Sequence, residues 1–104
     1  MKMPLRGEVW LCDLGLAAKI RPVVVVSAPF GDLDYALFHI IPHTTTVRHS
    51  QFEVVITVPF LQPGAFNIQG SQSVPRAWLV RQLGTLNTNQ IGQIEASLRH
   101  WLQL

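Results

Sequence analysis

The run of four consecutive valines, Val23 to Val26, limits the fold more than any other feature of this chain. A strand with one face in water alternates apolar and polar residues, and this run does not alternate. We therefore expect residues 21–27 to form a strand that apolar side chains cover on both faces. Pro22 cannot donate a backbone hydrogen bond, which places it among the first residues of that strand.

Other short β-type runs lie before and after this strand, separated by turn residues. Residues 35–43 are largely apolar on both alternating sides, so we expect a second central strand there. The pattern is weakest between residues 65 and 75. The remaining expected strands are residues 7–13, 51–58, 66–69, 72–74 and 81–85, the last of them after a turn of helix that begins near Trp78.

An amphipathic helix is predicted at the end of the chain. Polar residues 87–90 supply N-cap candidates. Strands followed by one helix indicate an α+β domain, and we expect a small, strongly bent antiparallel barrel formed by residues 1–104 as one domain. The apolar residues expected to pack the helix on the sheet recur at spacings of three and four: Ile91, Ile94, Leu98, Trp101 and Leu102.

Composition excludes several classes of protein. Of the 104 residues, 48% are apolar and 13% charged, which excludes disorder and leaves apolar surface that a second copy could share. No apolar run approaches the roughly 20 residues that span a membrane, and the basic N-terminus lacks a signal-peptide core, so we expect a cytoplasmic protein. The single cysteine, Cys12, lies among apolar residues and should be a buried small side chain.

No motif for a metal or cofactor is present in the sequence. The chain lacks a cysteine pair with ligand spacing, a His-x-x-x-His helix and a glycine-rich phosphate loop, so neither zinc nor a nucleoside triphosphate is expected. Among the histidines, His39 should lie in the core or an interface and His100 on a solvated helix face. His43 and His49 flank a polar loop, which leaves a two-histidine ribonuclease site open.

The most informative pair of residues is Arg21 and Thr44. Arg21 opens one central strand and Thr44 follows the other, so an antiparallel pairing would bring them together. A guanidinium there could hold a phosphate through two hydrogen bonds, and a threonine hydroxyl could donate to the same oxygens. The residues alone also allow a surface arginine beside a solvated turn, and the net charge of +2 does not decide between the two.

Several blocks along the chain resemble the MazF/PemK family of toxins, in the order in which the family carries them. Together they cover almost the whole chain. The blocks are Arg6-Gly7-Glu8-Val9-Trp10, Arg21-Pro22-Val23-Val24-Val25-Val26-Ser27, Ile41-Pro42-His43-Thr44-Thr45-Thr46, Phe52-Glu53-Val54 and Leu79-Val80-Arg81-Gln82-Leu83-Gly84-Thr85-Leu86, followed by the closing helix.

This resemblance implies an SH3-like barrel with a C-terminal helix, a homodimer, and cleavage of single-stranded RNA as the toxin of a type II toxin–antitoxin system. It implies attack by the ribose 2′-OH without a metal ion, and a cognate antitoxin as partner. The catalytic pair of the family falls on Arg21 and Thr44. The residues expected to bind RNA around that pair are Lys19, Ser27, His43, Thr45, Thr46 and Arg48.

The chain departs from the family pattern at two places. The connection over residues 14–20 is shorter than the loop that many members carry there, and residues 69–72 stand where many members have an Asp-Gln pair. The sequence therefore does not indicate which RNA sequence would be cut or which antitoxin would bind. Two other functions stay open: a non-catalytic toxin that binds a protein such as DNA gyrase, as the CcdB toxins do, and a barrel-type interaction module without toxicity.

Overall fold

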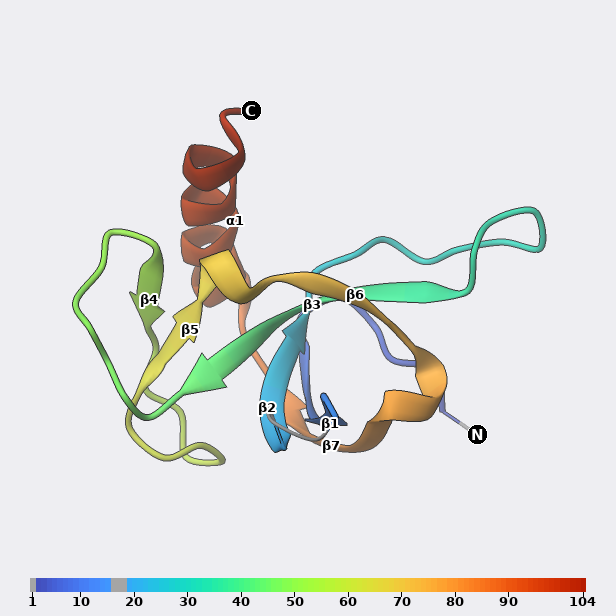
Figure 1. Ribbon diagram of the computed structural model, residues 1–104, viewed down its shortest axis with the longest axis horizontal. Coiled ribbons are helices and arrows are strands. Elements are labelled where there is room, and N and C mark those ends of the chain that lie inside the picture. Colours follow the sequence, from blue (N-terminus) through green and yellow to red (C-terminus); the bar gives the residue numbers. More distant parts are fainter. Residues whose placement is uncertain (1, 16–18) are drawn as a thin grey trace.

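The computed structural model describes residues 2–15 and 19–104 (Figure 1). In this part of the chain, seven strands form one antiparallel sheet, two short 3-10 turns interrupt it, and a single α-helix closes the chain. The elements are β1 (Glu8–Asp13), β2 (Ile20–Val25), β3 (Leu37–Thr44), β4 (Glu53–Val55), β5 (Ala65–Asn67), η1 (Ile68–Gly70), β6 (Gln72–Pro75), η2 (Arg76–Trp78), β7 (Leu79–Thr85) and α1 (Thr88–Leu102).

Strands β2 and β3 occupy the middle of the sheet, as their unbroken apolar runs predict. The strand order is β4-β5-β3-β2-β1-β7, and β6 also pairs with β3. Strand β3 therefore has β2 along one edge and both β6 and β5 along the other. The valine run lies at the centre of the sheet because its valine side chains point to both faces and each face must be covered by apolar residues.

The two faces of the central strands pack against different apolar clusters. Val23 and Val25 point into one cluster and Val24 and Val26 into the other, because successive side chains of a strand point to opposite faces. The first cluster lies inside the curl of β1, β2, β3, β6 and β7, and it contains Trp10, Cys12, Phe38, Ile40, Val74 and Leu79. The second lies toward α1, with Val9, Ile41, Ile56, Phe66, Ile68, Leu86 and Ile94.

The sheet is strongly bent but does not close into a barrel, which corrects one expectation. Its end strands, β4 and β7, do not pair with each other within residues 2–15 and 19–104. Each face already has its own cover, since α1 packs on one cluster and the curled strands enclose the other, so closure is not needed to bury the apolar side chains. The antiparallel α+β fold with a C-terminal helix is confirmed.

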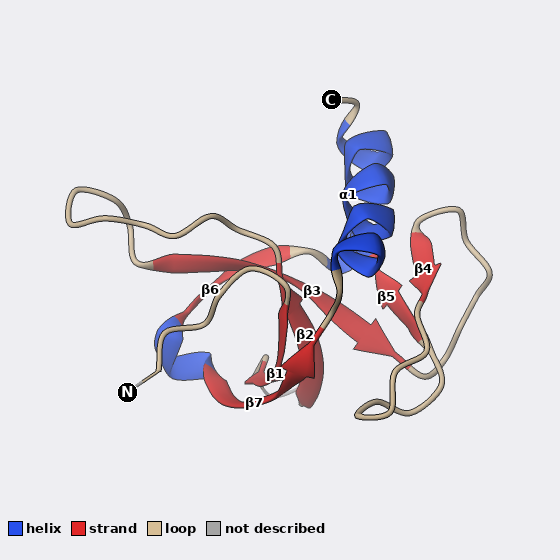
Figure 2. Cartoon of the chain, turned by 180° about the vertical axis from the view of Figure 1, so that it is seen from behind, coloured by secondary structure: helices blue, strands red, loops and turns tan. Residues whose placement is uncertain are grey.

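Helix α1 begins at Thr88 and is capped by Asn87, which lies within the segment of N-cap candidates. The Asn87 side chain accepts from the Gln90 backbone N–H at 2.8 Å, and the Gln90 side chain accepts from the Asn87 N–H at 2.9 Å, which forms a capping box. Ile94 is fully buried and the helix stands beside β4 and β5 in both views (Figures 1 and 2). Trp101 is 40% exposed and packs its ring on Phe52, with ring centroids 5.0 Å apart. Leu102 is 49% exposed where the last turn extends past the sheet, so its predicted packing was wrong.

Two of the weaker predictions need shorter bounds. The strand expected over residues 51–58 is only Glu53–Val55, and the strand expected over residues 66–69 ends at Asn67 and passes into η1.

Cys12 is fully buried as predicted, and burial raises the pKa of its thiol to about 11. No helix in the described part of the chain is long and apolar enough to cross a membrane.

Candidate active site

Strands β2 and β3 bring Arg21 and Thr44 to the same end of the sheet. The register pairs Val23 with Pro42 and Val24 with Ile41, and continuing it by two residues sets Arg21 opposite Thr44. The ladder ends before that point. Pro22 and Pro42 both lack an N–H, so neither strand can continue the hydrogen bonds there. The two strands therefore end on open space with Arg21 on one side and Thr44 on the other.

That space is a groove of about 610 Å³. It gathers seven of the eight residues that the sequence assigned to catalysis or RNA binding: Lys19, Arg21, His43, Thr44, Thr45, Thr46 and Arg48. Ile20, Pro42, Ser50, Glu53, Asn67 and Gln69 complete its walls.

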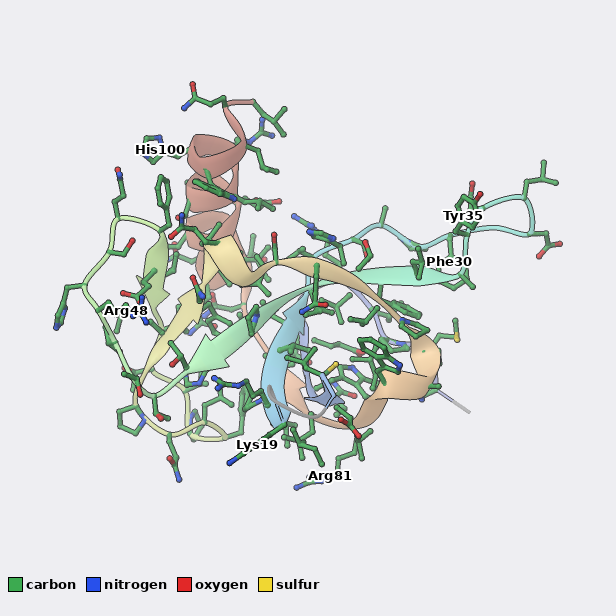
Figure 3. All side chains as sticks on the ribbon, viewed as in Figure 1. Lys19, Phe30, Tyr35, Arg48, Arg81 and His100 are labelled. Atoms are coloured by element: carbon green, nitrogen blue, oxygen red, sulfur yellow. The ribbon has the colours of Figure 1, made fainter. Side chains whose placement is uncertain are left out.

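Positive charge predominates along the groove. Lys19, Arg21 and Arg48 line it against one carboxylate, Glu53. Figure 3 shows Lys19 below the start of β2 and Arg48 on the loop that follows β3, whereas Arg81 lies on β7 at the bottom of the molecule and is absent from the groove lining. The cations of the groove attract a polyanion to this end of the sheet. Arg81 carries the same charge but lies outside the groove.

The Thr44 hydroxyl organises the first turn of the loop. Its Oγ1 accepts a hydrogen bond from the Thr46 N–H at 3.1 Å and lies 3.4 Å from the Thr46 carbonyl oxygen. The second contact is long and weak. The hydroxyl hydrogen can therefore turn toward a group in the groove while the oxygen continues to hold the loop.

Glu53 holds the rest of the same loop from β4. Its carboxylate accepts from the Arg48 N–H at 3.0 and 3.2 Å and from the Ser50 N–H at 2.9 Å. The acid thus satisfies backbone donors of an exposed turn that contains His49 in a left-handed conformation (φ 60°). This arrangement positions the segment that carries Arg48 over the groove.

His43 is the buried histidine of the site. The residue is 3% exposed, and its ring packs edge-on against Phe66 with ring centroids 5.1 Å apart. Its Nε2 has no hydrogen-bond partner among the described residues, and burial lowers the pKa of the imidazole. The neutral form is therefore favoured, and the ring supports the groove wall from behind.

A second hollow of about 320 Å³ continues from the groove and shares Arg21, His43 and Thr45 with it. Pro22, Phe60, Leu61, Gln62 and Leu83 form its more apolar walls. Gly64 directly precedes β5, and because it has no side chain it can lie against the end of β3. A Cβ at Gly64 would lie 2.1 Å from the Thr44 carbonyl oxygen and 2.8 Å from Cε1 of His43.

Ser27 is the predicted residue that does not reach the groove. It follows the opposite end of β2, where its Oγ accepts from the His39 N–H at 3.0 Å. The predicted short connection over residues 14–20 includes residues 16–18, which lie outside the described residues.

The other histidines lie away from the Arg21–Thr44 pair. His39 is half-buried with Nδ1 3.2 Å from Ser73 Oγ, as a strand histidine in a core or interface should be. His100 is exposed on α1, where its Nε2 lies 2.9 Å from Gln51 Oε1. His49 is exposed and does not line either hollow.

Sequence reasoning missed the groove residues that come from β4, β5 and η1. Glu53 was visible only as part of a matched block, and Asn67 and Gln69 lie in the segment with the weakest strand pattern. Asn67 interrupts the apolar stretch from Ala65 to Ile68 and Gln69 ends it, which is the one signal that could have pointed to them.

Known proteins resemble this chain in sequence and in fold. A probable endoribonuclease, MazF5 of Mycobacterium tuberculosis, is 40% identical over an alignment that covers 81% of this chain and 79% of that protein. A mycobacterial endoribonuclease solved in complex with its cognate antitoxin matches with a TM-score of 0.84 and 26% identity, covering 98% of this chain and 97% of that one.

A third protein, MazF of Deinococcus radiodurans, has the same fold, with a TM-score of 0.83 at 21% identity over the whole of both chains. The family model of PemK-like, MazF-like toxins of type II toxin–antitoxin systems matches residues 5–102. That match leaves out only four residues at the start of the chain and two at its end, and on this evidence the chain belongs to the PemK-like, MazF-like toxin family.

Proposed function

We propose that this protein is a toxin that cleaves single-stranded RNA by attack of the ribose 2′-OH, without a metal ion, at the groove between Arg21 and Thr44. The observation that carries the proposal is the juxtaposition of these two residues at the point where the β2–β3 ladder ends. A phosphate seated there meets a guanidinium and a hydroxyl from opposite walls. The 40% identity to a probable endoribonuclease supports RNA as the substrate.

In this mechanism the RNA phosphate binds Arg21 through two N–H donors, which stabilise the negative charge that develops on phosphorus as the 2′-oxygen attacks. Thr44 donates its hydroxyl hydrogen to a phosphate oxygen. The 2′-O–P bond forms and the P–O5′ bond breaks, and the proton lost by the 2′-OH is balanced by one gained at the 5′-oxygen. The products are a 2′,3′-cyclic phosphate and a 5′-OH, and DNA is not a substrate because it lacks the attacking group.

The remaining predicted residues bind rather than react. Lys19 and Arg48 attract the RNA backbone, and Thr45 and Thr46 offer hydroxyls on the exposed side of the loop. We assign His43 a supporting role, because it is buried against Phe66 behind the two hollows that it lines. Ser27 holds the other end of β2 and plays no part in binding RNA.

We further propose a cognate antitoxin as partner, a homodimer as the working form, and the cytoplasm as the place of action. A similar mycobacterial endoribonuclease was solved with its cognate antitoxin, which supports the first of these. We also infer that the curled sheet is an open variant of the SH3-like barrel implied by the resemblance.

The test compares Arg21→Ala with Arg81→Ala on a long single-stranded RNA in the presence of EDTA. Loss of a donor to a developing oxyanion slows a reaction about 100-fold or more, so Arg21→Ala should leave the RNA nearly uncut. Arg81→Ala removes the same charge outside the groove and should cut like the unmodified protein. Equal cutting by both variants contradicts the proposal, and growth arrest by Arg21→Ala with intact cellular RNA would favour a toxin that acts by binding a protein.

A further inference from the structure

Two carboxamide side chains in the groove have no role in the proposed reaction. Asn67 ends β5 and Gln69 lies in η1, and both line the groove with Arg21 and Thr44. Neither carboxamide has a hydrogen-bond partner among the residues that the structure describes. Each therefore presents a free donor and a free acceptor to whatever enters the groove.

Asn67 is held in place without using its polar atoms. It stands at the N-cap of η1, where an asparagine ordinarily accepts a hydrogen bond from the turn that follows, yet its side chain makes no such bond. Gly70 leaves room for it. A Cβ at Gly70 would lie 3.2 Å from Nδ2 of Asn67 and 2.9 Å from Cγ of Pro42, which lines the same groove. Close packing thus restricts the carboxamide while its donor and acceptor stay available.

The neighbouring carboxylate, that of Glu53, already accepts hydrogen bonds from the protein backbone. Glu53 pairs with Asn67 across the β4–β5 ladder, and its carboxylate accepts the backbone N–H groups of Arg48 and Ser50. The hydroxyl of Ser50 already accepts the Phe52 N–H, so the two carboxamides are the side chains on this wall with both a donor and an acceptor unused. Asparagine and glutamine use this combination to read base edges, and single-stranded RNA exposes those edges.

We propose that Asn67 and Gln69 recognise the base adjacent to the cleaved phosphate, so that they determine which nucleotide this protein accepts at one position of its RNA substrate. The proposal rests on the proposed function, because it takes the phosphate between Arg21 and Thr44 as its reference point. The base enters the 610 Å³ groove between β5 and the loop held by Glu53. Asn67 and Gln69 then discriminate through hydrogen bonds that electrostatic attraction to the backbone cannot supply.

The test changes the hydrogen-bonding character of each carboxamide while keeping its shape. Asn67→Asp and Gln69→Glu turn a donor–acceptor pair into acceptors only. Guanine is the base of RNA whose Watson–Crick edge presents two adjacent N–H donors, so the preferred base at that position should shift toward guanine by roughly tenfold in at least one variant. Gln93→Glu adds the same charge on the exposed face of α1 and should leave the base preference unchanged.

The measurement is sequencing of cleavage ends from an RNA library with randomised positions, which gives rates for the four bases at each site. For a variant too slow to cut, the same ratios come from competitive binding of oligonucleotides with a 2′-deoxyribose at the cleavage site. Unchanged base ratios in both variants overturn the proposal while leaving the ribonuclease intact. Absence of cutting by the unmodified protein would instead overturn the proposed function and this inference with it.

Discussion

His43 differs from the other residues of the groove because burial, rather than a partner, governs its chemistry. Its ring packs against Phe66 and its Nε2 is unsatisfied among the described residues. The position directly before Thr44 made it a candidate for acid–base catalysis. The alternation of the strand favours a supporting role: Thr44 and His43 point to opposite faces, and the His43 ring packs on Phe66 of the cluster under α1, although the residue also lines both hollows.

Stability should fall in mild acid because of this histidine. Burial lowers the pKa of His43, so below about pH 6.5 the unfolded chain binds a proton there that the folded chain resists. The contribution is fully present above the unfolded pKa and is lost as the pH falls below it. Urea unfolding at pH 7.5 and pH 5 should show a smaller difference in unfolding free energy for His43→Leu than for the unmodified protein.

In His43→Leu the unfolding free energy should still differ between pH 7.5 and pH 5, since His39 remains and burial also lowers its pKa. At pH 7.5 we expect His43→Leu to be within about 1.5 kcal/mol of the unmodified protein, because it replaces an unsatisfied ring with an apolar side chain of similar volume. An identical pH dependence in the two proteins would show that His43 does not titrate differently on unfolding.

The juxtaposition of Arg21 and Thr44 could be predicted from the sequence because it follows from strand order alone, whereas their catalytic role is implied by the family resemblance. Two apolar runs that pair antiparallel bring their ends together whatever the rest of the fold does. Glu53, Asn67 and Gln69 could not, because their place depends on how β4 and β5 pair with each other and with β3. That register is a long-range property, and residues 65–75 carry too weak a pattern to reveal it.

At the scale of elements, the site depends on how closely the chain before β5 approaches the end of β3. Gly64 is the point of contact, since it lies against the Thr44 carbonyl with no room for a Cβ. The predicted central strands and the helix have strong patterns and were right to within a few residues. The prediction of a closed barrel was wrong, because closure depends on which faces of the sheet other elements cover, and no local sequence pattern encodes that.

Replacing Gly64 by alanine should damage both stability and activity. The new Cβ meets backbone at 2.1 Å, which cannot move as a side chain can, so we expect a loss of roughly 1–3 kcal/mol of stability together with slower RNA cleavage. Gly92→Ala is the matched control. It lies in α1 with nothing within 4 Å of the added Cβ and should gain about 0.5–1 kcal/mol.

Thermal unfolding and cleavage rates measured for both variants check this expectation. If Gly64→Ala is as stable and as active as the unmodified protein, the turn before β5 does not position Thr44. A loss of stability in Gly92→Ala would show instead that α1 is sensitive to any added methyl group.

At the scale of the whole molecule, apolar side chains remain on the surface at positions far from the groove. Tyr35 is 88% exposed on the loop between β2 and β3, which projects from the body of the protein, and Leu104 is 83% exposed after α1 (Figures 1 and 3). Leu33 on the same loop is also fully exposed, so this loop carries two neighbouring apolar side chains in water. Neighbouring exposed apolar residues can form part of an interface, and the homodimer that we propose from the family resemblance could cover them.

Light scattering on the purified protein at micromolar concentration should therefore give twice the mass of the 11.7 kDa chain. The same measurement on Tyr35→Ser should give a smaller average mass if this loop takes part in the contact. A monomeric mass for the unmodified protein at this concentration contradicts the proposed dimer without affecting the chemistry of the groove.

The chemistry itself is tested most directly by the ends of the cleaved RNA. Single-stranded RNA is incubated with the protein in EDTA, and the fragments are analysed for their terminal groups. Attack by the 2′-OH at the Arg21–Thr44 groove predicts a 2′,3′-cyclic phosphate on one fragment and a 5′-OH on the other, with both lost in Arg21→Ala. Uncut RNA, or fragments with a 3′-OH and a 5′-phosphate, would contradict it.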